Sequence, residues 1–130
     1  GLACRLFAEK ATAEQRQALK DAFKELQAAA RRSDAQNRLR TKNQFYACLL
    51  DGSQNEALGS CLHILNSRVS LLRATSMTAP GRIKKSIAEL SSLMEALMAR
   101  DGERASELGR LHVQMAADAA LKLLTEEEPT

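Results

Sequence analysis

The sequence predicts an all-α fold, an antiparallel bundle of about six helices. Ala and Leu, both strong helix formers, supply 22 and 20 of the 130 residues, whereas aromatic residues make up only 3%. Six glycines and two prolines are few for an all-β sandwich, which needs many tight turns. Apolar residues also recur every three or four positions in long runs between short breaks. A chain of this length is expected to form one domain.

Four turn-forming clusters and a short first break divide the chain into its expected helices. These helices span residues 2–10, 13–31, 35–50, 55–76, 81–99 and 103–124, and an acidic tail follows at 125–130. Thr12 with Gln15 fits a capping box at the start of the second helix. Asp34, Ser53 and Asp101 are candidate caps of the third, fourth and sixth helices. Long helices joined by short connections predict antiparallel neighbours.

The fourth expected helix has the most regular apolar pattern, because its apolar residues alternate by four and three positions. They are Leu58, Leu62, Leu65, Val69 and Leu72. This spacing is typical of one helix face, so we expect the stripe to be buried in the core. The fifth helix carries a similar stripe from Ile83 to Leu97.

Composition restricts the classes of partner. The chain has 19 basic and 16 acidic residues and a formal net charge of +3, too mild to indicate nucleic-acid binding. No stretch approaches the ~20 apolar residues of a membrane span, and the N-terminus shows no signal-peptide pattern. The three cysteines lack metal-type spacing and are expected to be buried, reduced thiols. We therefore expect a cytoplasmic protein without membrane contact.

Catalytic motifs are weak. The sequence has no Gly-rich phosphate loop, HExxH, CxxC or GxSxG, and no paired Glu-x-x-His for a di-iron centre. Its two histidines are His63 and His112, and His63 falls on the surface side of the fourth helix. We therefore expect that this protein is not an enzyme. A helical enzyme built on a Tyr46–His112 pair is the rival interpretation, and a second ionisable group with a shifted pKa near His112 would favour it.

Lys42 shares the apolar face of the third helix with Leu39 and Tyr46. A lysine aimed at a core costs several kcal/mol unless it is paired or neutralised. Either Lys42 extends to the edge of the bundle, or it meets an anionic ligand.

Two further polar residues border apolar stripes. Arg68 lies between Leu65 and Leu72 on the fourth helix and is either a surface residue or a ligand contact. His112 shares a face of the sixth helix with Ala116 and is either a hydrogen-bonded core histidine or a ligand contact.

Four segments resemble the FCD domain, the effector-sensing C-terminal domain of the FadR branch of GntR-type bacterial transcription regulators. In the first, Phe45, Asn55 and Leu58 fall in register with the family's Phe-His and Gly-Asn-x-x-Leu segment. The others are residues 2–12, residues 89–105 and the Arg110-Leu-His112 motif. The resemblance covers nearly all of residues 2–124 and implies six helices. It also implies a single sensing domain over residues 1–130, with a truncated first helix and the winged helix-turn-helix absent from this chain.

The sequence departs from this family at the positions that usually hold a divalent metal. The resemblance assigns those positions to Lys42, Tyr46, Leu90 and His112, of which only His112 is a usual ligand. Zinc sites need three or four protein ligands, so we expect no metal and no other cofactor.

The same positions suggest a site for an organic acid. Lys42, Tyr46, Arg68 and His112 are the candidate ligand-binding residues, and together they would hold a small carboxylate by charge-assisted hydrogen bonds. Leu90 favours the alternative, a structural dimerisation bundle whose former site is filled by apolar packing. The resemblance leaves open a third possibility, a sensor of acyl-CoA or another large effector. It also implies a homodimer that contacts DNA only through the missing N-terminal domain.

Overall fold

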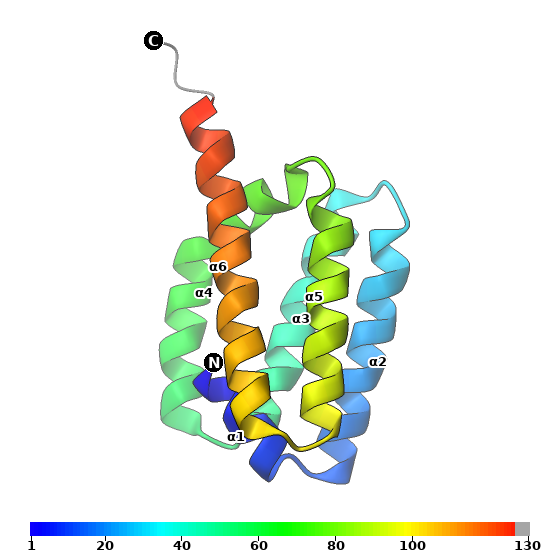
Figure 1. The fold of residues 1–130 in the computed structure, drawn as a ribbon, viewed down its shortest axis with the longest axis vertical. Coiled ribbons are helices and arrows are strands. Elements are labelled where there is room, and N and C mark those ends of the chain that lie inside the picture. The colour runs from blue at the N-terminus through cyan, green and yellow to red at the C-terminus, as the bar shows by residue number, and fades with distance from the viewer. Residues whose placement is uncertain (127–130) are drawn as a thin grey trace.

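The computed structural model describes residues 1–126 as a bundle of six α-helices (Figure 1). The helices are α1 (Leu2–Lys10), α2 (Ala13–Ala30), α3 (Ala35–Ser53), α4 (Glu56–Thr78), α5 (Arg82–Met98) and α6 (Gly102–Glu126). Residues 1–126 contain no strand, and the predicted all-α class is confirmed. Predicted and observed helix ends agree to within three residues.

Side-chain caps explain most of the helix starts. Thr12 and Gln15 form the predicted capping box, with reciprocal bonds of 3.1 and 3.0 Å. Asp34 and Asp101 each accept a backbone N–H three residues later, as predicted. Ser53 was the wrong choice for α4, because α3 continues through it and its hydroxyl donates to the Leu50 carbonyl. Asn55 caps α4 instead, at 2.9 Å from the Leu58 amide.

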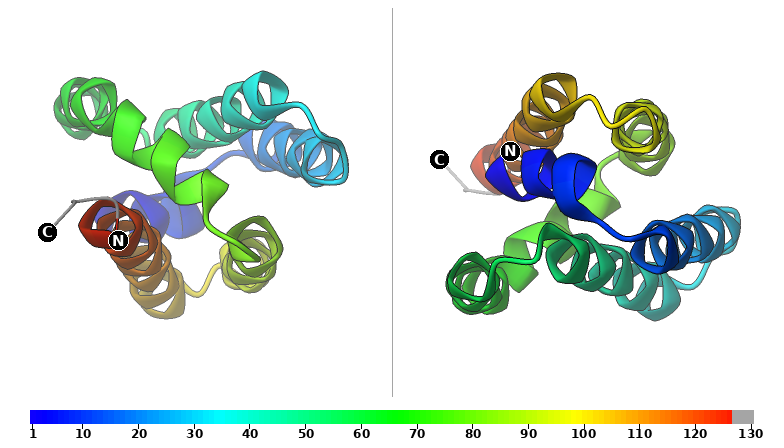
Figure 2. Two further views of the ribbon diagram at one scale, coloured as in Figure 1. Left: turned by 90° about the horizontal axis from the view of Figure 1, so that it is seen from above. Right: turned by 90° about the horizontal axis from the view of Figure 1, so that it is seen from below.

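The core is centred between α2, α3, α5 and α6, and the short α1 closes one end of it (Figure 1). Phe7, Leu19, Phe45, Leu90 and Leu97 are completely buried there. Seen from above, the C-terminal part of α4 crosses the opposite end of the bundle towards α5 (Figure 2). The bundle is therefore covered at both ends, and one of its sides is formed by α4 and α6.

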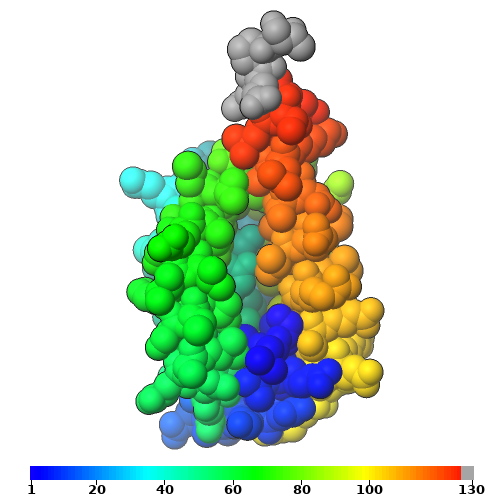
Figure 3. All heavy atoms as spheres, turned by 90° about the vertical axis from the view of Figure 1, so that its left-hand side faces the viewer, coloured from blue at the N-terminus to red at the C-terminus, as the bar shows by residue number. Residues whose placement is uncertain are grey.

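The regular apolar stripe of α4 is not buried as predicted. Leu65, Val69 and Leu72 are 53, 37 and 41% exposed, and Ser76 is the one buried residue of this helix. The space-filling view shows why: the surface is hollowed between α4 and α6, and α3 lies behind the hollow (Figure 3). Periodicity identifies the face of a helix that turns towards the molecule. Here that face meets a groove rather than packed side chains.

Two smaller expectations also change. Cys4 is buried as expected, but Cys48 is half-buried and Cys61 is exposed. The acidic tail does not begin at Thr125, because α6 continues to Glu126 with a Lys122–Glu126 ion pair along it. Residues 127–130 of that expected tail lie outside the described residues. No helix within residues 1–126 combines the length and apolar character that a membrane span requires.

Gly52 marks the closest approach of α1 to α3. A Cβ atom at Gly52 would lie 2.2 Å from the Phe7 ring, whereas one at Gly59 on α4 would meet nothing within 4 Å. Both glycines lie in helices, so the intrinsic gain from alanine is similar and only the available space differs.

Gly52→Ala is expected to lower the free energy of unfolding by about 1–3 kcal/mol, because Phe7 must shift in a packed core. Gly59→Ala is expected to raise it by up to about 1 kcal/mol. Urea denaturation of both variants checks this. Equal effects at the two positions would contradict the packing of α1 against α3.

Candidate functional site

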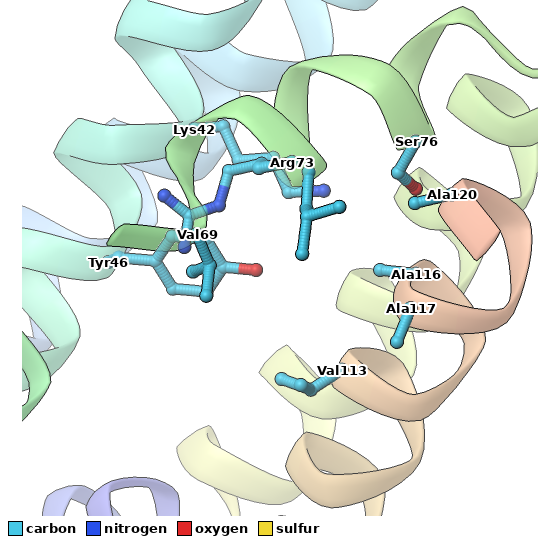
Figure 4. A pocket seen from close by; sticks show the side chains of 10 residues that line it. Lys42, Tyr46, Val69, Arg73, Ser76, Val113, Ala116, Ala117 and Ala120 are labelled. Carbon is cyan, nitrogen blue, oxygen red and sulfur yellow. The ribbon is translucent and has the colours of Figure 1, made fainter. Parts of the chain in front are cut away.

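A cavity of about 170 Å³ lies in the groove between α3, α4 and α6. Its polar lining residues are Lys42, Tyr46, Arg73 and Ser76. Its apolar lining residues are Val69, Leu72, Val113, Ala116, Ala117 and Ala120. In the close-up, Lys42, Arg73 and Tyr46 gather on the α3–α4 side, and the alanines of α6 face them across open space (Figure 4). Leu90, on which the alternative of a filled site rested, is completely buried in the apolar core and does not line this cavity.

Lys42 is buried in the wall of this cavity. Its side chain is 3% exposed, so it does not extend to the edge of the bundle. The ammonium group donates one hydrogen bond, to Ser86 Oγ at 3.2 Å. Burial, followed by the nearby charges of Arg82 and Arg73, lowers the pKa of Lys42 to about 8. At neutral pH the amine is still mostly protonated, and only one of its three N–H groups has a protein partner.

Tyr46 and His112 begin a chain of hydrogen bonds that runs from the cavity into the bundle. The Tyr46 hydroxyl lies 3.2 Å from Nε2 of His112, and Nδ1 of His112 lies 2.8 Å from a carboxylate oxygen of Glu89. A carboxylate only accepts, so Nδ1 carries the proton and Nε2 accepts from the tyrosine hydroxyl. Arg82 closes the chain with two bonds to Glu89, at 2.6 and 2.8 Å.

Helical spacing brings these groups together. Lys42 and Tyr46 are one turn apart on α3, so they project from the same face. Arg82, Ser86 and Glu89 follow each other at intervals of four and three residues on α5. His112, Ala116 and Ala120 are likewise spaced by four on α6. Each helix therefore contributes one continuous face to the site.

Burial and neighbouring charges set the protonation states of the groups in this chain of hydrogen bonds. Burial, together with the positive charge of Lys42, lowers the pKa of His112 to about 4, so its imidazole is neutral. Burial raises the pKa of Tyr46 to about 12, so the phenol keeps its proton. Burial alone would raise the pKa of Glu89, but the hydrogen bonds from Arg82 and His112 outweigh it and lower that pKa. Glu89 is therefore ionised and forms a salt bridge with Arg82.

Arg73, and not Arg68, is the arginine that lines the cavity together with Lys42. Arg68 is exposed on α4 and does not line this cavity, so the expected ligand contact at this residue is not found there. The Arg73 guanidinium lies 4.7 Å from the centre of the Tyr46 ring, close enough for a cation–π interaction. It also donates to the side-chain oxygens of Asn43 and Asn66, at 3.0 and 2.9 Å. These contacts hold Arg73 in the cavity wall.

The cavity wall therefore has an excess of positive charge. Lys42 and Arg73 are the cations among its described lining residues, and no carboxylate is among them. Arg82 and Glu89 lie near Lys42 but outside this lining. Both Glu89 oxygens are engaged by Arg82 and one also by His112, so this carboxylate does not neutralise Lys42 directly. A buried charge without a counter-charge is unfavourable. An anion in the cavity would relieve it.

The residues present do not fit a metal ion. Of the four positions that the family resemblance assigned to a metal, Lys42 brings a positive charge and Leu90 lies in the apolar core. His112 already donates Nδ1–H to Glu89 and accepts from Tyr46. Within residues 1–126, no three His, Cys, Asp or Glu side chains come together as a possible metal site.

Lys42, Tyr46 and His112 were all found from the sequence, and the structure brings these three together. Sequence reasoning missed Arg73, Arg82, Ser86 and Glu89. A signal existed for the α5 residues, because they form a polar stripe beside the apolar stripe that contains Leu90. Nothing comparable marked Arg73, whose place depends on how α4 crosses α3.

A protein-family model described as "FCD domain" matches residues 1–115 of the chain. No curated protein matches the sequence.

Stability is expected to fall as the pH drops from about 6.5 towards 4, because the unfolded chain protonates His112 more readily than the folded chain does. The neutral, buried His112 makes its full contribution to the free energy of unfolding above pH 6.5. This contribution is about 3 kcal/mol, because folding lowers the pKa from 6.5 to about 4 and each tenfold change in the acid dissociation constant corresponds to about 1.4 kcal/mol. Urea midpoints between pH 7 and 4 measure it. His112→Gln should flatten this dependence, whereas His63→Gln, at an exposed position, should preserve it. Equal slopes in all three proteins would contradict a buried neutral His112.

Proposed function

The chain belongs to the FCD family, the effector-binding domains of GntR-type transcription regulators, and on that premise we propose that it senses a small organic acid without a metal ion. The cavity between α3, α4 and α6 would be the binding site. Lys42, Tyr46 and Arg73 would contact the carboxylate, and His112 would hold the tyrosine hydroxyl in position. FCD domains are regulatory and not catalytic, which agrees with the expectation that this chain is no enzyme.

The observation that carries this proposal is the buried, under-partnered Lys42 in the wall of a cavity. Its ammonium group has one protein hydrogen bond, and two guanidinium groups stand near it. A carboxylate offers the acceptors and the negative charge that this group lacks, and charge-assisted hydrogen bonds are about twice as strong as neutral ones. A metal is not required, because Lys42 and Arg73 supply the positive charge.

The two alternatives from the sequence are less well supported. A purely structural bundle needs no cavity with a buried lysine in its wall. An acyl-CoA is far larger than about 170 Å³, so it would leave most of its surface outside the cavity.

A structural change caused by ligand binding would be transmitted to the rest of a regulator through α4. Leu65, Val69 and Leu72 are partly exposed beside the cavity, so a ligand there would give α4 contacts that it now lacks. A ligand shifts an equilibrium only by binding one arrangement better than another, and these added contacts supply that difference. We infer that the arrangement of α4 biases the DNA-binding domain with which GntR-type regulators pair this module.

The proposal includes a homodimer, because two DNA half-sites imply a two-fold axis. Ile64 and Leu71 lie seven residues apart on α4 and are 57 and 76% exposed. Residues at this spacing lie on one side of a helix. We assign the dimer contact to this side of α4.

Carboxylates are expected to raise the melting temperature of the domain by several degrees at saturation, and Lys42→Met should abolish this shift while the fold stays intact. Lys85→Met, at an exposed position on α5, is the matched control and should keep the shift. A thermal-shift screen of acids, run with and without EDTA, measures it. Elemental analysis of the same protein, purified without chelator, should give well under one equivalent of Zn, Ni or Mn.

A carboxylate response that survives in Lys42→Met would contradict the anion site. A response lost on adding EDTA would show that a metal binds the acid after all.

Leu71→Glu is expected to convert the dimer to a monomer, because it places a charge in an apolar contact. Sedimentation velocity at micromolar concentration measures the change. Leu121→Glu, at an exposed apolar position on α6, should leave the dimer intact. A dimer that persists in Leu71→Glu would place the contact elsewhere.

A further inference from the structure

We propose that the effector is a monocarboxylic acid with an apolar body, about the size of one aromatic ring, and not a sugar acid or a dicarboxylic acid. This inference rests on the proposed function and names the class of acid that the cavity selects. It follows from three features of the cavity: the separation of its polar and apolar sides, its volume, and the few hydrogen-bonding groups on its α6 wall.

The two sides of the cavity differ in chemistry. The cations and the tyrosine hydroxyl belong to the α3–α4 side, where Lys42, Arg73 and Tyr46 lie close together (Figure 4). The opposite wall is made by Val113, Ala116, Ala117 and Ala120 of α6 (Figure 4). A bound acid would therefore place its carboxylate against α3 and α4, and the rest of the molecule would extend towards α6.

The α6 wall offers very little to a second polar group. Its four lining side chains are hydrocarbon, and α4 adds Val69 and Leu72 beside them. Ser76 is the one hydroxyl among the lining residues near Ala120. The hydroxyls of a sugar acid that turn towards this wall would lose water and find Ser76 as the one hydroxyl partner among the lining residues there. Each unpaired polar group weakens binding by roughly tenfold or more. The second carboxylate of a dicarboxylic acid would face the same apolar wall, and the free-energy cost of desolvating a charge there is higher than that of desolvating a hydroxyl.

The volume limits the apolar body. An engineered apolar cavity of about 150 Å³ binds benzene. The present cavity of about 170 Å³ is similar in size and is open to the groove on one side. A single ring or a short branched chain fills it, and benzoate has the required shape: one carboxylate attached directly to one ring.

The experiment is isothermal titration calorimetry of four acids against the whole 130-residue chain. Benzoate and cyclohexanecarboxylate are the apolar probes, and gluconate and succinate are the polar ones. We expect each apolar acid to bind at least tenfold more tightly than either polar acid. Burial of apolar surface should also give the apolar acids a negative heat-capacity change on binding.

Two variants test the position of the apolar body. Ala116→Phe fills the α6 side, which lies across the cavity from Lys42 (Figure 4), so benzoate should lose at least tenfold in affinity while acetate, which has no ring, keeps its own. Met115→Phe adds the same ring at a 40% exposed position of α6 outside the cavity, and should change neither. If Ala116→Phe does not fold, Ala117→Leu at an exposed lining position replaces it.

The outcomes separate the two levels of the proposal. If gluconate or succinate binds as tightly as benzoate and Lys42→Met abolishes that binding, the apolar class is wrong but acid sensing stands. The apolar class also fails if Ala116→Phe leaves benzoate binding unchanged. If no acid binds, the proposed function fails as well, and this inference fails with it.

Discussion

The buried ammonium group of Lys42 is the constraint on which the site depends. Its side chain reaches the middle of the bundle from α3 and finds one neutral partner, Ser86. The nearest carboxylate, Glu89, is already held by Arg82 and His112. A charge in that position is costly unless something else compensates it. The cavity beside it supplies the space for a compensating anion, so burial, charge and cavity point to the same chemistry.

The chain from Tyr46 to Arg82 gives this site a fixed geometry. Each member is oriented by the next one: Arg82 holds Glu89, Glu89 fixes the tautomer of His112, and His112 accepts from Tyr46. The imidazole is neutral because its surroundings disfavour a further positive charge. The tyrosine hydroxyl is thereby placed at the cavity wall beside Lys42 and Arg73. His112, which the family resemblance assigned to a metal position, is here part of a hydrogen-bond network.

Helix α4 links this network to the outside of the molecule. It contributes Arg73 to the cationic end of the cavity, and its apolar stripe lines the same groove while remaining partly exposed. A core-facing helix with this pattern would be locked by packing, whereas α4 has contacts left to gain. This is the physical basis for expecting that α4 responds to an effector. In the proposed dimer, the exposed Ile64 and Leu71 would carry that response to a second copy of the chain.

The sequence by itself determined the six helices and their approximate limits, because helix propensity, capping and periodicity are local properties. The candidates Lys42, Tyr46 and His112 came together as a set only through the family resemblance. Periodicity put Lys42 and His112 on apolar helix faces, and the structure decided that both are buried. Only the tertiary structure decided that the stripe of α4 borders a groove, that Arg73 rather than Arg68 reaches Tyr46, and that Glu89 and Arg82 hold His112. These facts depend on how far apart two helices stand and how they cross, and the spacing of residues along one helix carries no information about the distance to its neighbour.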